Sequence, residues 1–270
     1  MTVRLFLRYD GRGFCGWQIQ NEGGSENPSK PTVQGTLNKA LRELLRDDSI
    51  KVTGCSRTDT GVHALDYCAS FEVSSLTVPA DKICLALRPL LPETLTVFRS
   101  EIAPDGFNAR YDTVKKTYRY LFYCGESSFP SLDANAWFVK TQTAPDLETM
   151  NSAAAKLVGT HDFSAFCGDL KNVKTTLRTI YSCTVKKSEL VVGEGCIGVY
   201  VLEITGDGFL YNMVRIIAGT LVYTGLGKMT PDDVEKALEN KARKDAGITA
   251  PPQGLYLSKV YLREENPAQP

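Results

Sequence analysis

Arg57-Thr58-Asp59-Thr60-Gly61-Val62-His63-Ala64 is the stretch around which the chain is organised, between a polar turn and an apolar run. Asp59 follows Arg57 by two residues, and a nearby opposite charge favours the ionised form of a carboxyl group. Gly61 permits a sharp backbone course that can bring Asp59 out toward a ligand. Such a carboxylate can act as a nucleophile or a general base. The alternative is a surface turn that Asp59 caps while pairing with Arg57.

The composition bounds the class of protein. The 270 residues suit one large domain or two small ones, and 43% are hydrophobic, which is enough for a core. Lys+Arg and Asp+Glu both number 31, so a nucleic-acid binder of this composition needs a local basic face. The sequence has neither a signal-like N-terminus nor an apolar run of membrane length, and we expect a cytoplasmic protein.

The cysteines and histidines argue against a metal site. The eight cysteines are at positions 15, 55, 68, 84, 124, 167, 183 and 196. None forms a C-x-x-C pair, and the chain has only two histidines. We therefore expect no metal, and we expect scattered thiols in a reducing compartment.

Hydrophobic periodicity predicts alternating strands and helices. In the first half, strands are expected at Thr2–Tyr9, Tyr67–Val73 and Thr94–Arg99, and helices at Thr32–Arg46 and Asp81–Arg88. In the second half, strands are expected at Lys115–Tyr123, Arg178–Val185, Val199–Thr205 and Leu255–Leu262, and helices at Asp146–Val158, Asn212–Leu226 and Pro231–Arg243. Residues 21–31 lack apolar side chains and predict a mobile loop.

Two residues of the second half have open interpretations from chemistry alone. Tyr118 lies in a run of interleaved basic and aromatic residues, which can stack bases and bind phosphates. The residues alone favour the alternative, in which the aromatic rings are core and the charges are solvated. Arg215 lies in the apolar run Met213–Ile217, where a buried cation needs an anionic partner. The natural partner is Asp59, and the alternative is an arginine that extends from the helix to solvent.

Motifs from Tyr9 to Leu257 resemble those of the bacterial tRNA pseudouridine synthase A family. The matching segments are Arg57–Ala64 (R-T-D-x-G-V-H-A), Tyr9–Gln20 (Y-D-G-x-x-F-x-G-W-Q-x-Q), Thr32–Gly35 (T-V-Q-G), Phe107–Arg110 (F-x-A-R), Gly159–Phe166 (G-x-H-D-F-x-x-F), Gly206–Arg215 (G-x-x-F-L-x-x-M-V-R) and Ala250–Leu257 (A-P-x-x-G-L-x-L). The chain departs from the family at Arg88, where an asparagine is usual, and at Ser56, where glycine is commoner.

The resemblance implies an α+β fold of two ferredoxin-like (RRM-like) halves that share a central, mostly antiparallel sheet, with a basic cleft between them. We expect the N-terminal half at residues 1–104, the C-terminal half at 105–264 and a frayed tail at 265–270. The family also implies a homodimer.

The function implied by the resemblance is isomerisation of uridine to pseudouridine in the anticodon stem-loop of tRNA (positions 38–40), without cofactor or metal. Asp59 is then the catalytic nucleophile, Tyr118 contacts the target base, and Arg215 pairs with Asp59. Arg57, His63 and Phe209 complete the expected substrate-binding set. The other histidine, His161, is interpreted as structural. The sequence does not choose between attack at ribose C1′ and at base C6.

Three alternatives remain open at this point. The first is an RNA-binding protein of the same fold without catalysis, and the second is a pseudouridine synthase that acts elsewhere in tRNA. The third is a glycosidase with a carboxylate nucleophile, which needs a second carboxylate near Asp59. Asp66, Asp112 and Asp207 are the candidates for that second group.

Overall fold

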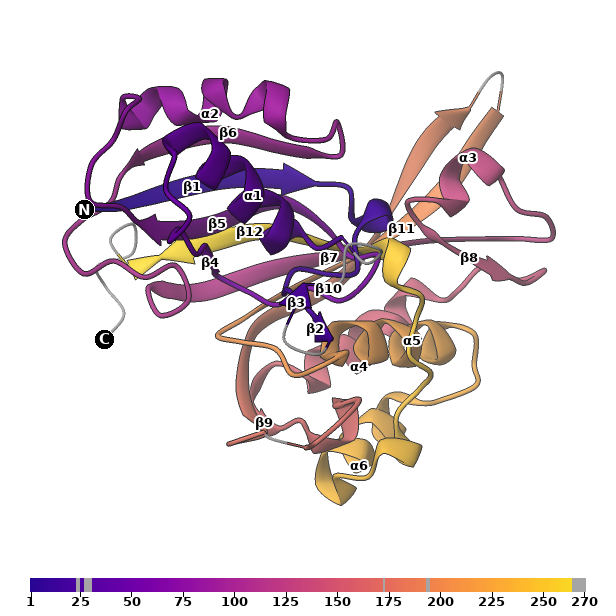
Figure 1. Cartoon of the computed structure of the whole chain (residues 1–270). Helices are drawn as coiled ribbons and strands as arrows, with labels where there is room; N and C mark the ends of the chain where they lie inside the picture. Colours follow the sequence, from indigo (N-terminus) through magenta and orange to yellow (C-terminus); the bar gives the residue numbers. More distant parts are fainter. Residues whose placement is uncertain (23–24, 27–30, 172, 193–194, 264–270) are drawn as a thin grey trace. The chain divides into compact units, whose positions relative to one another are not determined.

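The computed structural model describes residues 1–22, 25–26, 31–171, 173–192 and 195–263 (Figure 1). The chain forms two compact units. The N-terminal unit is Met1–Val114 with Leu257–Pro270, and the central unit is Lys115–Tyr256. The last strand belongs to the N-terminal unit, and the expected halves at residues 1–104 and 105–264 stay a prediction. The expected tail at 265–270 lies outside the described residues.

The N-terminal unit is built on strands in the order β6-β1-β5-β12. These are β6 (Leu95–Ile102), β1 (Thr2–Tyr9), β5 (His63–Glu72) and β12 (Leu255–Leu262), and the short β4 (Thr53–Gly54) pairs with β5. β1 is antiparallel to both of its neighbours, β5 and β6. The expected strand over Leu255–Leu262 is confirmed. Asn21–Glu22 (β2) and Ser25–Glu26 (β3) form a separate antiparallel pair, and the rest of the expected loop lies largely outside the described residues.

Helix α1 (Val33–Leu45) confirms the helix expected after Thr32. The Thr32 side chain accepts a hydrogen bond from Gly35 N at 3.2 Å, which satisfies one of the helix's free amides. Val3, Leu5 and Leu7 of β1 and Leu37 and Leu41 of α1 are all 0% exposed and form the core of this unit.

The helix expected over Asp81–Arg88 is interrupted. The structure has a 3₁₀ turn at Ala80–Lys82, a short α2 (Ile83–Ala86) and a second 3₁₀ turn at Arg88–Leu90. Pro89 accounts for the end of α2, because it has no amide to donate and disfavours the α conformation at the residue before it. The amide of Cys84 in α2 donates to Ser100 Oγ on β6 at 2.9 Å.

The central unit is built on strands in the order β7-β11-β10-β9. These are β7 (Thr113–Gly125), β11 (Gly195–Gly206), β10 (Leu177–Val192) and β9 (Gly159–Asp162), and β8 (Trp137–Lys140) is parallel to β7. The other pairs are antiparallel, which confirms the expected pairing of the strands at 178–185 and 199–205. The helices are α3 (Pro130–Asp133), α4 (Leu147–Lys156), α5 (Met213–Gly225) and α6 (Pro231–Asn240). The mixed α+β class with mostly antiparallel strand pairing is thus confirmed.

Aromatic side chains of β7 form part of the core of the central unit. Tyr120, Phe122 and Tyr123 are at most 1% exposed and Tyr118 is 5% exposed, so all four rings are buried, as the core interpretation of this aromatic run expects. Arg119 lies on the strand face opposite Tyr118, Tyr120 and Phe122 and pairs with Glu203 at 2.7 Å. No helix within the described ranges is long and apolar enough to cross a membrane.

Candidate active site

The loop that carries Asp59 is a hydrogen-bonded turn. Val62 N donates to the carbonyl oxygen of Asp59 at 3.1 Å, and Gly61 has a φ of 78°. A positive φ at the third position of a four-residue turn is strained for any residue with a Cβ atom, so glycine is needed there. Asp59 itself is half-buried.

The N-terminal segment fixes the residue next to Asp59 from two sides. The hydroxyl groups of Tyr9 and Thr58 are hydrogen-bonded at 2.8 Å, and Trp17 N donates to Thr58 O at 3.0 Å. Gly16 has a φ of 83°, and a Cβ atom on it would lie 2.6 Å from Thr58 O. The Gly-Trp pair of the N-terminal motif is therefore explained by its close packing on the Asp59 loop.

Beneath this loop lies an aromatic stack. The rings of Trp17 and Tyr67 are stacked with centroids 4.3 Å apart, and a Cβ atom on Gly54 would lie 2.2 Å from the Tyr67 hydroxyl. That hydroxyl donates to the carbonyl oxygen of Ser56 and accepts from Ser56 N. These contacts use only the main chain of Ser56, so they do not require the family's commoner glycine.

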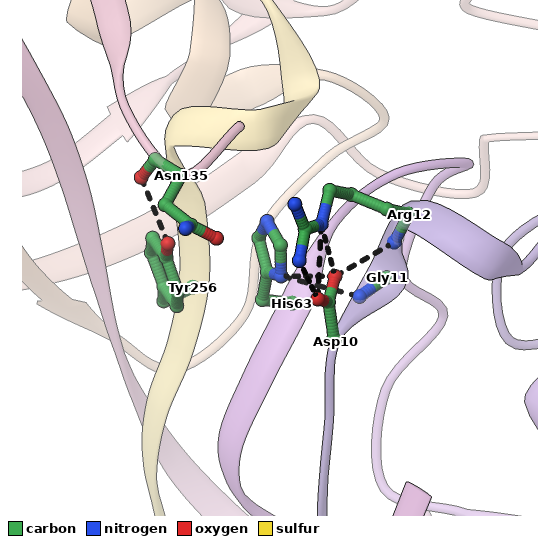
Figure 2. Close-up of polar contacts among 6 residues, drawn as sticks. All are labelled: Asp10, Gly11, Arg12, His63, Asn135 and Tyr256. Carbon is green, nitrogen blue, oxygen red and sulfur yellow. Dashed lines mark hydrogen bonds and ion pairs between the residues drawn. The ribbon is translucent and has the colours of Figure 1, made fainter. Parts of the chain in front are cut away.

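His63 is 2% exposed and faces Gly11 and Asp10 of the N-terminal segment (Figure 2). Gly11 N donates to His63 Nδ1 at 3.2 Å, and Asp10 Oδ1 lies 3.3 Å from the same nitrogen. The Gly11 amide acts as a donor to Nδ1, so this contact fixes the imidazole ring against the N-terminal segment.

Asp10 and Arg12 form an ion pair that sequence reasoning missed. Arg12 Nε lies 2.9 Å from Asp10 Oδ2, and this hydrogen-bonded pairing lowers the pKa of the Asp10 carboxyl group (Figure 2). Asp10 is part of the Y-D-G pattern quoted above, which is the only signal that pointed to it. Of the other residues expected in this unit's part of the site, Arg57 is exposed to solvent.

The carboxylates that a glycosidase would need are engaged elsewhere. Asp66 accepts from Val260 N at 3.2 Å, and Asp112 accepts from Asn108 N at 2.7 Å. Asp207, in the central unit, accepts from Thr179 N at 3.0 Å. Each therefore stabilises a backbone segment of its own unit, which gives the glycosidase alternative no support.

In the central unit, Tyr118 and Phe209 are brought together. Their rings meet edge to face, with centroids 5.1 Å apart and planes at 81°. Gly206, on the strand end before Phe209, would place a Cβ atom 3.2 Å from the Phe209 ring and 2.9 Å from Thr179 O. The glycine of this block is thus needed for Phe209 to approach the strand.

Arg215 lies in the first turn of α5 and is half-buried. Its Nε donates to Ala250 O at 2.7 Å and its Nη1 donates to Asn212 Oδ1 at 2.8 Å. Asn212 has a φ of 60°, a conformation that asparagine tolerates better than most residues. Two hydrogen bonds therefore fix the plane of the guanidinium group, and its pairing with Asp59 stays a prediction.

His161 is in the structural setting expected of it: its Nε2 is hydrogen-bonded to Val158 O at 3.0 Å and its ring meets Phe163 edge to face. In the part of the chain that the structure describes, no group of three or more His, Cys, Asp or Glu side chains is placed to hold a metal ion.

Comparison with known proteins gives consistent matches. A family model described as "tRNA pseudouridine synthase" matches residues 153–261. The "tRNA pseudouridine synthase A" of Bacillus subtilis (strain 168) is 43% identical over 262 residues, 97% of this chain and 99% of the relative. The protein of the same name from Thermoanaerobacter sp. (strain X514) is 40% identical over 259 residues, 96% of this chain and 98% of the relative.

Proposed function

The chain belongs to the tRNA pseudouridine synthase A family of isomerases, and on that premise we propose that it converts uridine to pseudouridine in the anticodon stem-loop of tRNA. Asp59 is the proposed nucleophile. The observation that carries the proposal is the construction of its loop, in which Tyr9 and Trp17 hold Thr58 and Gly61 closes the turn. A surface turn that only capped itself would not need contacts from a segment this far away in sequence.

The proposed reaction needs an ionised carboxylate and an accessible base. The target uridine leaves its stack, which costs a few kcal/mol. Asp59 attacks ribose C1′ or uracil C6, the bond between N1 and C1′ breaks, and the uracil turns. A bond then forms between C5 and C1′, and the covalent bond to Asp59 breaks and releases the free carboxylate. C5 loses a proton and N1 gains one, so atoms balance without a cofactor or metal.

The other predicted site residues support this chemistry in distinct ways. The Tyr118 ring, oriented by Phe209, is the proposed surface against which the uracil lies. Arg215 and Arg57 are proposed to favour the charged form of Asp59, because an opposite charge nearby stabilises it. His63 remains a proposed substrate-binding residue, although its observed Nδ1 contact is with Gly11 and favours a role in shaping the loop.

The family premise extends to the assembly. The two units are proposed to be ferredoxin-like halves, and two chains are proposed to form a homodimer in the cytoplasm. The antiparallel strands with accompanying helices in each unit support the first part. Light scattering on the pure protein tests the second, and full turnover by a monomer would contradict it.

The decisive experiment incubates the pure protein with tRNA transcripts in the presence of a chelator and maps pseudouridine by carbodiimide labelling and primer extension. We expect modification on the 3′ side of the anticodon arm. Modification elsewhere would retain the chemistry and change the substrate site. Binding without any modification would instead support the non-catalytic RNA-binding alternative.

A further inference from the structure

A cluster of two arginines and two phenylalanines lies on the outer strands of the N-terminal unit. We call it the Arg–Phe patch, and it consists of Phe6 and Arg8 on β1 and Phe98 and Arg99 on β6. The Arg8 guanidinium carbon lies 4.6 Å from the centroid of the Phe98 ring, and that of Arg99 lies 3.7 Å from the Phe6 ring. The two rings are 6.5 Å apart, so the four side chains form one contiguous cluster.

The patch faces outward for reasons of strand geometry. Side chains alternate along β1, so Leu5 and Leu7 are fully buried while Arg8 is exposed. β6 is the outermost strand in this unit's strand order, and an irregularity in its register with β1 falls beside Phe98. Such irregularities redirect side chains. Phe98 is 39% exposed, so part of its ring is open to a ligand.

The charge of the patch is not neutralised by the protein. The neighbouring Arg4 pairs with Glu101 at 2.7 Å, so that carboxylate is engaged. Neither Arg8 nor Arg99 has a carboxylate partner within the described parts of the chain. A guanidinium group stacked on a ring keeps its N–H groups directed sideways, where they can donate to phosphate. In a chain of zero net charge, two such cations beside an exposed ring form a local basic site.

This combination fits a nucleic-acid strand, which offers phosphates and flat bases at adjacent positions. A single arginine packed on an aromatic ring would be weak evidence for a binding site, because such contacts occur about once per 70–80 residues. Here two cations and an exposed ring lie together, which is the pairing that single-stranded nucleic-acid binders use. β1 thus carries the patch on one face and, on the other face, Tyr9, whose hydroxyl group holds Thr58 beside Asp59.

We propose that the Arg–Phe patch binds a segment of the tRNA outside the target nucleotide, with Arg8 and Arg99 on phosphates and Phe98 against a base. The proposal rests on tRNA being the substrate. It assigns the patch to substrate affinity and not to the chemical step, since none of its residues belongs to the Asp59 loop.

The test is tRNA binding by the double variant Arg8→Gln/Arg99→Gln, measured by fluorescence anisotropy at several salt concentrations. We expect Kd to rise about tenfold, with the slope of log K against log salt falling by about 1.5, since each lost phosphate contact removes about 0.7–0.9. KM should rise in parallel while kcat at saturating tRNA stays unchanged. Phe98→Leu should weaken binding several-fold without changing the slope.

The matched control is Lys39→Gln/Arg88→Gln, which removes the same charge from exposed positions on α1 and on the 3₁₀ turn after α2. It should leave binding within twofold. If the patch variant unfolds, Arg8→Lys/Arg99→Lys keeps the charge and should keep most of the salt slope. Thermal unfolding of every variant reports its integrity.

Two outcomes would overturn the proposal. Unchanged tRNA binding by the folded patch variant would remove the RNA role. A change in oligomeric state on light scattering would make the patch a contact between copies of the chain. Failure of the proposed function is a separate outcome, because it would appear as absent pseudouridine with the unsubstituted protein.

Discussion

The Asp59 loop and the first turn of the Arg215 helix differ in the contacts that hold their charged groups in place. Asp59 lies on a turn whose neighbour Thr58 is held by Tyr9, 49 residues earlier in the chain. Arg215 lies on a helix whose neighbours Val214 and Ile216 are at most 3% exposed, and it donates to Asn212 three residues away and to the carbonyl oxygen of Ala250, 35 residues away. A loop carboxylate thus depends on the shape of distant residues, whereas a helical cation depends on its own helix and a few polar contacts.

The comparison implies two kinds of sensitivity. A loop packed this closely should respond to small added volumes far from Asp59 in sequence. The helix should tolerate such changes but respond to the loss of a hydrogen-bond acceptor. The following predictions test this difference, beginning with the largest expected effect.

Asp59→Ala should abolish turnover, with a loss on the order of 10⁴- to 10⁶-fold as for other catalytic groups of covalent enzymes. tRNA binding should stay within about threefold, because the phosphate contacts that dominate affinity are elsewhere. Single-turnover assays and anisotropy measure the two quantities. Asp59→Asn, which keeps the volume and removes the charge, should behave alike. Surviving turnover in either variant would contradict the nucleophile assignment.

Gly16→Ala should damage the loop through a single methyl group. The added Cβ would lie 2.6 Å from Thr58 O at a φ of 83°, so we expect a loss of about 2 kcal/mol or more in unfolding free energy. Turnover should fall by about 10²-fold, since a 1 Å displacement near the reacting group has that effect. Urea unfolding and kcat measure both.

The control is Gly106→Ala, at a φ of 78° with no atom within 4 Å of the added Cβ. It carries the same backbone penalty, about 1 kcal/mol, without a clash. Its turnover should equal that of the unsubstituted protein. Equal losses of turnover in the two variants would mean that backbone strain, and not contact with Thr58, explains the effect.

Much of the secondary structure was predictable because the spacing of apolar residues indicates which face of each strand or helix is buried. The apolar residues of β12 and α5 predicted the bounds of both elements to within one residue at each end. β10 was expected to end at Val185 but continues to Val192. The sequence did not predict this extension, because Lys186 and Lys187 are exposed in succession and interrupt the alternation of buried and exposed residues that identifies a strand.

The arrangement of the site was less predictable, for a physical reason. Periodicity tells which face of a strand is buried but not which strand lies beside it. The contact of Gly11 with His63 joins residues 52 apart, and no local pattern encodes it. The motif resemblance placed Asp59, Tyr118 and Arg215 in one function, yet it did not indicate that Asn212 binds the Arg215 side chain.

Tyr118→Leu should lower turnover by about tenfold, whereas Tyr118→Phe should stay within about threefold. The phenylalanine keeps the ring and its edge-to-face contact with Phe209, and the leucine removes both. kcat at saturating tRNA measures the effect, with thermal unfolding as the control for this side chain, which is 5% exposed. Equal turnover of the two variants would remove the stacking role.

Asn212→Gly should have the smallest effect of the four and the most local one. Glycine adopts the observed φ of 60° without strain, so the unfolding free energy should change by less than about 1 kcal/mol. The variant nevertheless removes the acceptor for Arg215 Nη1, leaving Ala250 O as the observed acceptor for Nε. We expect kcat to fall several-fold with little change in KM, and Asn212→Asp, which keeps an acceptor oxygen, to recover most of the loss. If both variants turned over normally, the Ala250 carbonyl and the helix would suffice to orient Arg215, and the dependence on polar contacts inferred for this region would be wrong.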